Sequence, residues 1–90
     1  MYSAQLNIIS HHVNQYMSQR SLIETMWIKG AVSDSEADRA YKNIWEDAVN
    51  DIAQKAWVTE TEAASYLLDA LAEEKEKNFV LEHVDGRMSI

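Results

Sequence analysis

The residues of this 90-residue chain whose types could support metal binding are three histidines and their polar neighbours. His11 and His12 are adjacent, so on a helix their side chains point about 100° apart and do not converge on one metal ion. His12 and Tyr16 have the four-residue spacing of helical metal ligands, but the sequence offers no third ligand beside them. His83 stands alone near the C-terminus. We therefore expect no metal site and no bound cofactor.

Paired carboxylates offer a second kind of chemistry. Asp47 and Asp51 lie one helical turn apart, and such a pair can supply acid–base catalysis when one member is desolvated. Lys55 follows one turn later, which favours a solvated helix edge. Cysteine is absent, and the two glycines, Gly30 and Gly86, stand apart, so the chain has no thiol nucleophile and no glycine-rich phosphate loop. We expect a protein that is not an enzyme.

The helix that carries this aspartate pair has a clear start signal. Ser33 followed by Glu36 is a capping box, and Thr59 followed by Glu62 repeats the signal later in the chain. Between the two signals, apolar residues recur at steps of three and four and cover about half of the helix circumference. That breadth is typical of a helix with neighbours on two sides. The pattern predicts a middle helix over residues 34–57 and a third helix over 60–77.

The first helix is predicted over residues 3–29, with Gly30 as its left-handed stop. It carries a heptad seam, which we interpret as its contribution to an intramolecular core; a seam shared with a second copy is the alternative. Residues 1–19 contain no formal charge, and Ile8, Leu22 and Met26 form a second apolar strip beside the seam. Because burying a charge is costly, the uncharged polar face of this helix is expected to be covered by a partner.

Two features of the sequence leave alternatives open. Residues 78–90 form a tail that either extends the third helix or runs as an extended arm, and its Phe79 and Leu81 need cover from the same chain or from a second subunit. Trp57 falls off the apolar stripe of the middle helix. It either folds into the following turn or forms an exposed anchor for a partner, since tryptophan is enriched at binding hot spots.

These observations predict an all-α fold, a single domain over residues 1–90. We expect a three-helix antiparallel bundle with a short C-terminal tail that dimerises through the first helix or the tail. The predicted core consists of Leu6, Ile9, Val13, Tyr16, Ile23, Trp27, Ala37, Tyr41, Ile44, Trp45, Ala48, Ile52, Leu67 and Leu71.

The charge of the chain restricts its partners. The net charge of −7 is uneven: residues 1–30 hold one acid and two bases, whereas residues 31–90 hold 14 acids and six bases. Such a surface repels nucleic acids and anionic membranes and attracts basic protein surfaces. No signal peptide or membrane-spanning stretch is recognisable, so a cytoplasmic location is expected.

We therefore predict a small acidic binding module, an inhibitor or adaptor that docks on a basic protein, including one that handles nucleic acid. Its contacts are expected at acids of the second and third helices: Glu46, Asp47, Asp51, Glu73, Glu74 and Glu76. The alternative is a helical assembly or chaperone subunit that acts through homo- or hetero-oligomerisation. Its expected contacts are Ile8, His12, Tyr16, Leu22, Met26, Phe79 and Leu81. A homodimer is the expected state.

Overall fold

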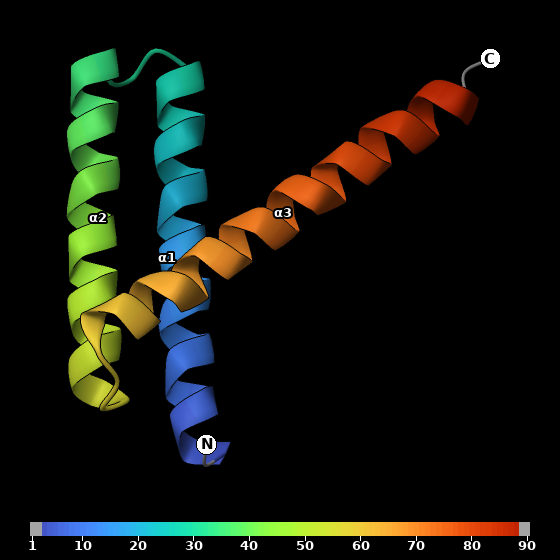
Figure 1. Cartoon of the computed structure of the whole chain (residues 1–90). Helices are drawn as coiled ribbons and strands as arrows, with labels where there is room; N and C mark the ends of the chain where they lie inside the picture. The colour runs from blue at the N-terminus through green and yellow to red at the C-terminus, as the bar shows by residue number, and fades with distance from the viewer. Residues whose placement is uncertain (1–2, 89–90) are drawn as a thin grey trace.

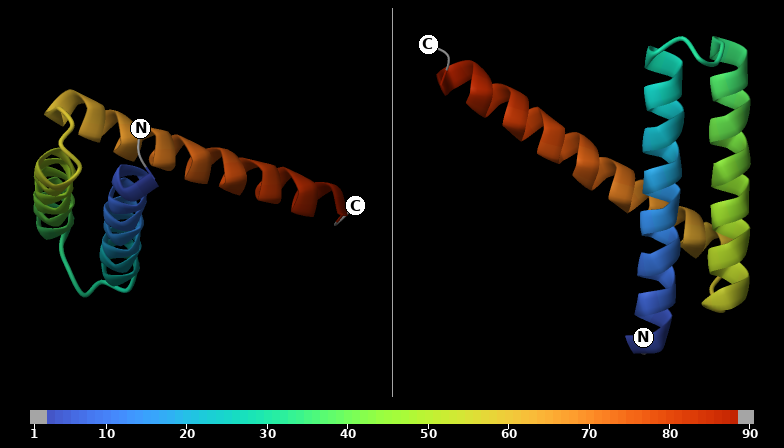
Figure 2. Two further views of the ribbon diagram at one scale, coloured as in Figure 1. Left: turned by 90° about the horizontal axis from the view of Figure 1, so that it is seen from below. Right: turned by 180° about the vertical axis from the view of Figure 1, so that it is seen from behind.

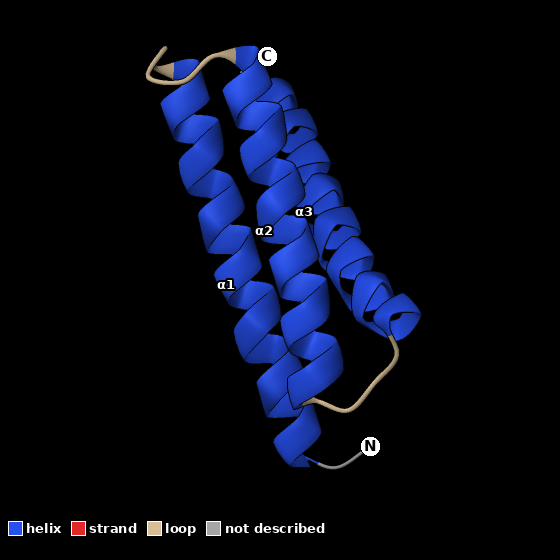
Figure 3. Ribbon diagram, turned by 90° about the vertical axis from the view of Figure 1, so that its left-hand side faces the viewer, coloured by secondary structure: helices blue, strands red, loops and turns tan. Residues whose placement is uncertain are grey.

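The protein is built from three helices. The computed structural model describes the backbone of residues 3–88 and the side chains of residues 3–75. The helices are α1 (Ser3–Ile28), α2 (Asp34–Lys55) and α3 (Glu60–Met88). Within the described residues only helices and their connecting loops are present (Figure 3). The prediction of an all-α fold with three helices packed together is confirmed.

The helices form a hairpin and a crossing arm. α1 and α2 run antiparallel, and α3 lies obliquely across one face of this hairpin, crosses α1 near its middle and continues beyond it (Figures 1 and 2). α3 remains one helix to Met88, through most of the segment for which the sequence left a helical extension and an extended arm open. The side chains of Glu76, Phe79 and Leu81 lie outside the described residues.

Contacts along the whole hairpin set the register of α1 against α2. In four of them, the two residue numbers add up to 61, as an antiparallel pair of helices with equal rise requires. They are the hydrogen bond from Gln5 Nε2 to the Ala56 carbonyl oxygen (2.8 Å), the edge-to-face pair of Tyr16 and Trp45 (ring centroids 5.8 Å apart), the guanidinium of Arg20 over the Tyr41 ring (4.9 Å from its centroid), and the hydrogen bond from Trp27 Nε1 to Asp34 Oδ1 (2.6 Å).

Gly30 allows the hairpin to turn. Its φ of +77° is in the left-handed region, where a side chain would be strained. The Gly30 amide donates to the Trp27 carbonyl oxygen (3.0 Å) and the Ala31 amide to that of Met26 (2.8 Å), which is a Schellman motif. α2 then starts at the Ser33 capping box, in which the Glu36 amide donates to Ser33 Oγ and the Ser33 amide to Glu36 Oε1, both at 3.1 Å.

The end of α2 differs from the expectation. The helix stops at Lys55, two residues before the predicted end, because Trp57 adopts a left-handed backbone with φ of +56°. The Val58 amide donates to the Ala53 carbonyl oxygen at 3.2 Å and so closes a second Schellman motif, here with tryptophan in the position that usually favours glycine. The Trp57 side chain is 88% exposed, so it does not fold into the turn.

The core is small and lies where α3 crosses the hairpin. Ile52 and Leu67 are its fully buried bulky side chains, and alanines at positions 48, 56 and 63 let the helices approach closely. The placement of Leu6 and Trp27 in the core was wrong: they are 50% and 46% exposed. Trp27 contacts α2 through Asp34, but α3 covers only the part of the hairpin that it crosses (Figure 1).

Candidate functional site

A polar groove between α1 and α2 brings together the chemically versatile side chains. Sequence reasoning treated His12 with Tyr16, and Asp47 with Asp51, as unrelated pairs. The antiparallel register places both pairs at the same level of the hairpin. The groove has a volume of about 180 Å³ and is lined by His12, Gln15, Tyr16, Gln19, Asp47, Ala48 and Asp51.

The groove opens on the face of the hairpin away from α3. α3 crosses the hairpin at the level of the groove (Figure 1), yet none of the groove's lining residues belongs to α3. The view from below shows α3 confined to one side of the α1–α2 pair (Figure 2). The groove therefore belongs to a surface that no other helix of the chain covers over residues 3–75.

His12 forms the most buried polar wall of the groove, with 9% of the residue exposed. Burial is the main cause that lowers its pKa below the ordinary value, and the positive charge of Lys55 lowers it further. Asp51 acts in the opposite direction, and His11, whose ring packs edge-to-face at 5.1 Å, adds to the lowering. His12 is therefore a neutral imidazole at pH 7, able to give and take a hydrogen bond.

The groove suits hydrogen bonding better than catalysis. In the described part of the chain, no three histidine, aspartate or glutamate side chains come together in a way that could hold a metal ion. Asp47 is exposed, and Tyr16, which is 3% exposed, packs against Trp45 rather than projecting into solvent. The desolvated carboxylate that acid–base chemistry needs is not formed by Asp47. The groove therefore presents two carboxylates and two glutamine amides as hydrogen-bonding groups.

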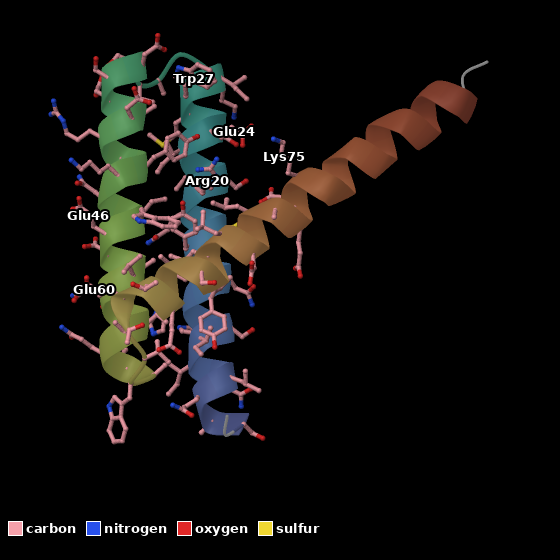
Figure 4. The ribbon with its side chains drawn as sticks, in the orientation of Figure 1. Arg20, Glu24, Trp27, Glu46, Glu60 and Lys75 are labelled. Atoms are coloured by element: carbon pink, nitrogen blue, oxygen red, sulfur yellow. The ribbon has the colours of Figure 1, made fainter. Side chains whose placement is uncertain are left out.

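The predicted acidic contact residues do not gather in one place. Glu46 lies on the side of α2 away from α1, and Glu60 at the start of α3 lies on the same side (Figure 4). Asp47 and Asp51 face the groove instead. Glu73 and Glu74 are exposed on α3 after it has crossed α1, in the stretch that Lys75 marks in Figure 4. The α2 group and the α3 group thus occupy opposite sides of α1.

The predicted oligomer contacts are partly brought together. Leu22 and Met26 are 61% and 38% exposed, and the half-buried Ile8 lies on the same side of α1 but about 21 Å from Leu22 along the helix. His12 borders the groove between these apolar ends. Tyr16 is buried, so within the chain it belongs to the core.

Sequence reasoning missed Gln15 and Gln19, which complete the surface between His12 and Leu22. A spacing signal could have found them, since residues 8, 12, 15, 19, 22 and 26 follow one another at alternating steps of four and three.

Comparisons with other proteins add no functional information. Searches against protein-family models, curated proteins and solved structures find no significant match for this chain. Over residues 3–88, no helix combines the length and the apolar character that crossing a bilayer requires.

Proposed function

We propose that this chain is a non-enzymatic protein-interaction module that works in the cytoplasm and docks, as an inhibitor or adaptor, on a basic protein surface. The observation that carries the proposal is the separation of charge: residues 1–30 have a net charge of +1, and the rest of the chain has −8. Exposed carboxylates on α2 and α3 attract a basic surface over long range and can compete there with a nucleic-acid backbone. A partner that handles nucleic acid therefore fits the charge.

The acidic residues on the α2 side and those on α3 can be tested separately as contacts for the basic partner. One variant carries Glu46→Lys with Glu60→Lys on the α2 side, and another carries Glu73→Lys with Glu74→Lys on α3. Immobilised wild type is expected to retain a basic protein from lysate at low salt and to release it at high salt, and one of the two variants is expected to lose it. Glu24→Lys on α1 is the control for a charge reversal outside both groups, with half the change in charge of each double variant.

The outcomes separate cleanly. Retention that resists salt would show that contacts other than charge hold the partner, and the acidic-docking proposal would fail. Retention that is sensitive to salt but survives both double variants would rule out these two groups as the contact. Identification of the retained protein by mass spectrometry, followed by the same variants against the purified partner, completes the test.

A second candidate function is favoured by a different observation. Leu22 and Met26 are exposed on a helix that has no charged residue before Arg20, and exposed apolar side chains on a nearly neutral surface favour association. In this reading the chain is an assembly or chaperone subunit that works through oligomerisation, with a homodimer as its unit. The acidic surfaces and α1 are separate, so both candidates can hold for one molecule.

A further inference from the structure

The groove between α1 and α2 contains a buried polar side chain that has no hydrogen-bond partner. His12 is 9% exposed, and within residues 3–75 its ring forms no hydrogen bond or ion pair. No nitrogen or oxygen of a buried or half-buried side chain in this range is both enclosed and unpaired, so both ring nitrogens of His12 reach open space. Because His12 lines the groove, that space is the groove. Buried polar groups are normally hydrogen-bonded, so this unpaired imidazole indicates a place for a ligand.

The carboxylates of the groove are unpaired as well. Over residues 3–75, Asp47 and Asp51 form no hydrogen bond or ion pair, and neither do the glutamine amides of the groove. Asp51 is half-buried, so its charge is partly removed from water with no cation bound to it. Lys55 is near enough to lower the pKa of His12, yet it forms no ion pair with Asp51. Two aspartates against one lysine leave the groove negative.

The hairpin register arranges these groups around one position. Residues whose numbers add up to 61 lie at the same level, so the backbone of His12 lies at the level of residue 49. That level is midway between Asp47 and Asp51, about 3 Å along the axis from each, at 1.5 Å rise per residue. Since all three side chains line one groove, the imidazole lies across from the space between two carboxylates.

We propose that this groove binds the guanidinium of an arginine side chain that belongs to the basic protein partner. The inference rests on the proposed docking function and names one contact within it. A guanidinium has five N–H donors and no acceptor, and the carboxylates and the neutral imidazole offer acceptors. Its donors lie on separate edges of a plane, so they can reach Asp47, Asp51 and His12 at the same time.

Size and hydration favour a guanidinium over other cations. An ammonium directs its three donors from one strongly hydrated atom, whereas a guanidinium is more weakly hydrated and has less hydration to lose in a half-buried site. The groove volume of about 180 Å³ accommodates one such head group, since a cavity of about 150 Å³ takes up benzene. A metal ion is disfavoured, because within residues 3–75 no three histidine, aspartate or glutamate side chains come together.

The position of the groove suits a contact with a protein surface. The groove lies on the face of the hairpin that α3 leaves open, so a partner can approach it without displacing a helix (Figure 2). The acidic surface as a whole attracts a basic partner over long range. A charge-assisted contact in a partly buried groove then slows dissociation and selects arginine over other basic side chains.

N-acetyl-argininamide tests the groove without the partner. It has the single charge of an arginine side chain and no charged termini. We expect it to shift the nuclear magnetic resonance signals of His12, Asp47 and Asp51 in a saturable way when it is titrated into the isotope-labelled chain at constant ionic strength. N-acetyl-lysinamide has the same charge and is expected to bind several-fold more weakly, because its ammonium cannot reach the acceptors on both sides of the groove.

Two single variants show whether the probe binds in the groove. Asp47→Asn and Asp51→Asn each remove one carboxylate with little change in size, and each is expected to weaken the binding of N-acetyl-argininamide about tenfold, as for the loss of a hydrogen bond to a charged group. Glu46→Gln is the matched control, because it removes one carboxylate from the same helix on the side away from α1 (Figure 4). It is expected to leave binding nearly unchanged, and circular dichroism reports whether each variant folds.

Failure of the groove differs from failure of docking. The inference is overturned if N-acetyl-argininamide gives no saturable shift, binds no more tightly than N-acetyl-lysinamide, or is unaffected by both aspartate variants. Salt-sensitive retention of a basic protein can still hold in each of these cases.

Elution of a retained partner connects the groove to docking. N-acetyl-argininamide is expected to release the basic protein at a lower concentration than N-acetyl-lysinamide, which matches it in charge. Equal release by the two probes would show that no arginine of the partner occupies the groove. If the arginine probe binds but no basic protein is retained, the docking proposal fails, and with it the assignment of the guanidinium to a protein partner.

Discussion

Trp27 Nε1 donates a hydrogen bond of 2.6 Å to the Asp34 carboxylate, and this contact joins the last turn of α1 to the first turn of α2. Both side chains lie at the surface (Trp27 is labelled beside the connecting loop in Figure 4). The carboxylate also faces the positive end of the α2 dipole, so it serves the helix start and the hairpin at once. The contact closes the hairpin at the end that α3 does not cover.

Replacing this donor tests its contribution to stability. Trp27→Phe keeps an aromatic ring but removes the N–H, and we expect the free energy of unfolding to fall by about 1 kcal/mol, as for a typical hydrogen bond. Denaturant unfolding followed by circular dichroism measures the change. Trp57→Phe is the control, since Trp57 is 88% exposed and its loss should leave stability unchanged. Equal effects of the two variants would mean that the 2.6 Å contact contributes nothing.

The capping box at Ser33 gives a second prediction. Ser33→Ala is expected to lower the free energy of unfolding by about 1 kcal/mol, because the Glu36 amide loses its acceptor. The Ser33 backbone amide is the main cause that lowers the pKa of Glu36, and the Ser33 side chain is the second. The variant keeps the amide and removes the hydroxyl, so the pKa should move only part of the way back toward its ordinary value. Nuclear magnetic resonance titration reads the pKa. An unchanged pKa in a folded variant would show that the Ser33 side chain does not contribute to the lowering.

Trp57 offers a test of backbone strain. A non-glycine residue in the left-handed region costs about 1–2 kcal/mol, and glycine avoids that cost but loses more entropy on folding. With φ of +56° at this position, we expect Trp57→Gly to be more stable than Trp57→Ala by about 1 kcal/mol. The comparison of these two variants removes any effect of losing the indole. If alanine matched glycine, the left-handed geometry at the end of α2 would be wrong.

The lowered pKa of His12 predicts how the free energy of unfolding depends on pH. Burial first, then Lys55 and His11, lower its pKa in the folded protein, and Asp51 alone raises it. Below the unfolded-state pKa of about 6.5, the unfolded chain therefore binds more protons than the folded one. The contribution of His12 to stability is full above about pH 6.5, falls as the pH drops below it, and becomes constant below the lower, folded-state pKa.

The variant His12→Gln isolates this effect from that of the carboxylates. As the pH is lowered from about 7 to 5, the unfolding free energy of the wild type should fall relative to that of the variant. Denaturant titrations at several pH values measure it. A constant difference over that range would show that His12 titrates alike in the folded and unfolded chains.

Local signals in the sequence predicted the helices well. Ser33 with Glu36 and Thr59 with Glu62 form both capping boxes, with the Glu62 amide donating to Thr59 Oγ1 at 3.1 Å. Gly30 has the left-handed backbone that the end of α1 requires. These features depend on residues within one or two turns of each other, so a single sequence contains all the information they need.

The arrangement of the helices and the groove depend on distant residues. His12 and Asp51 line one groove because the hairpin has one particular register, which contacts such as that of Tyr16 with Trp45 establish. The sequence pattern shows which side of α1 faces a neighbour but not where α3 crosses. Leu6 therefore seemed as suited to the core as Ile9, although the two are 50% and 4% exposed.

The oblique crossing of α3 divides this helix into two parts with different protection. Its first turns are packed on the hairpin, where Ala63 and Leu67 are wholly buried, whereas the later turns continue past α1 with no neighbouring helix of the same chain (Figures 1 and 2). Backbone amides in the packed turns should exchange with deuterium only when the whole domain unfolds. Amides in the later turns should exchange through local opening of the unsupported helix, so deuterium uptake along α3 should be higher after the crossing than before it.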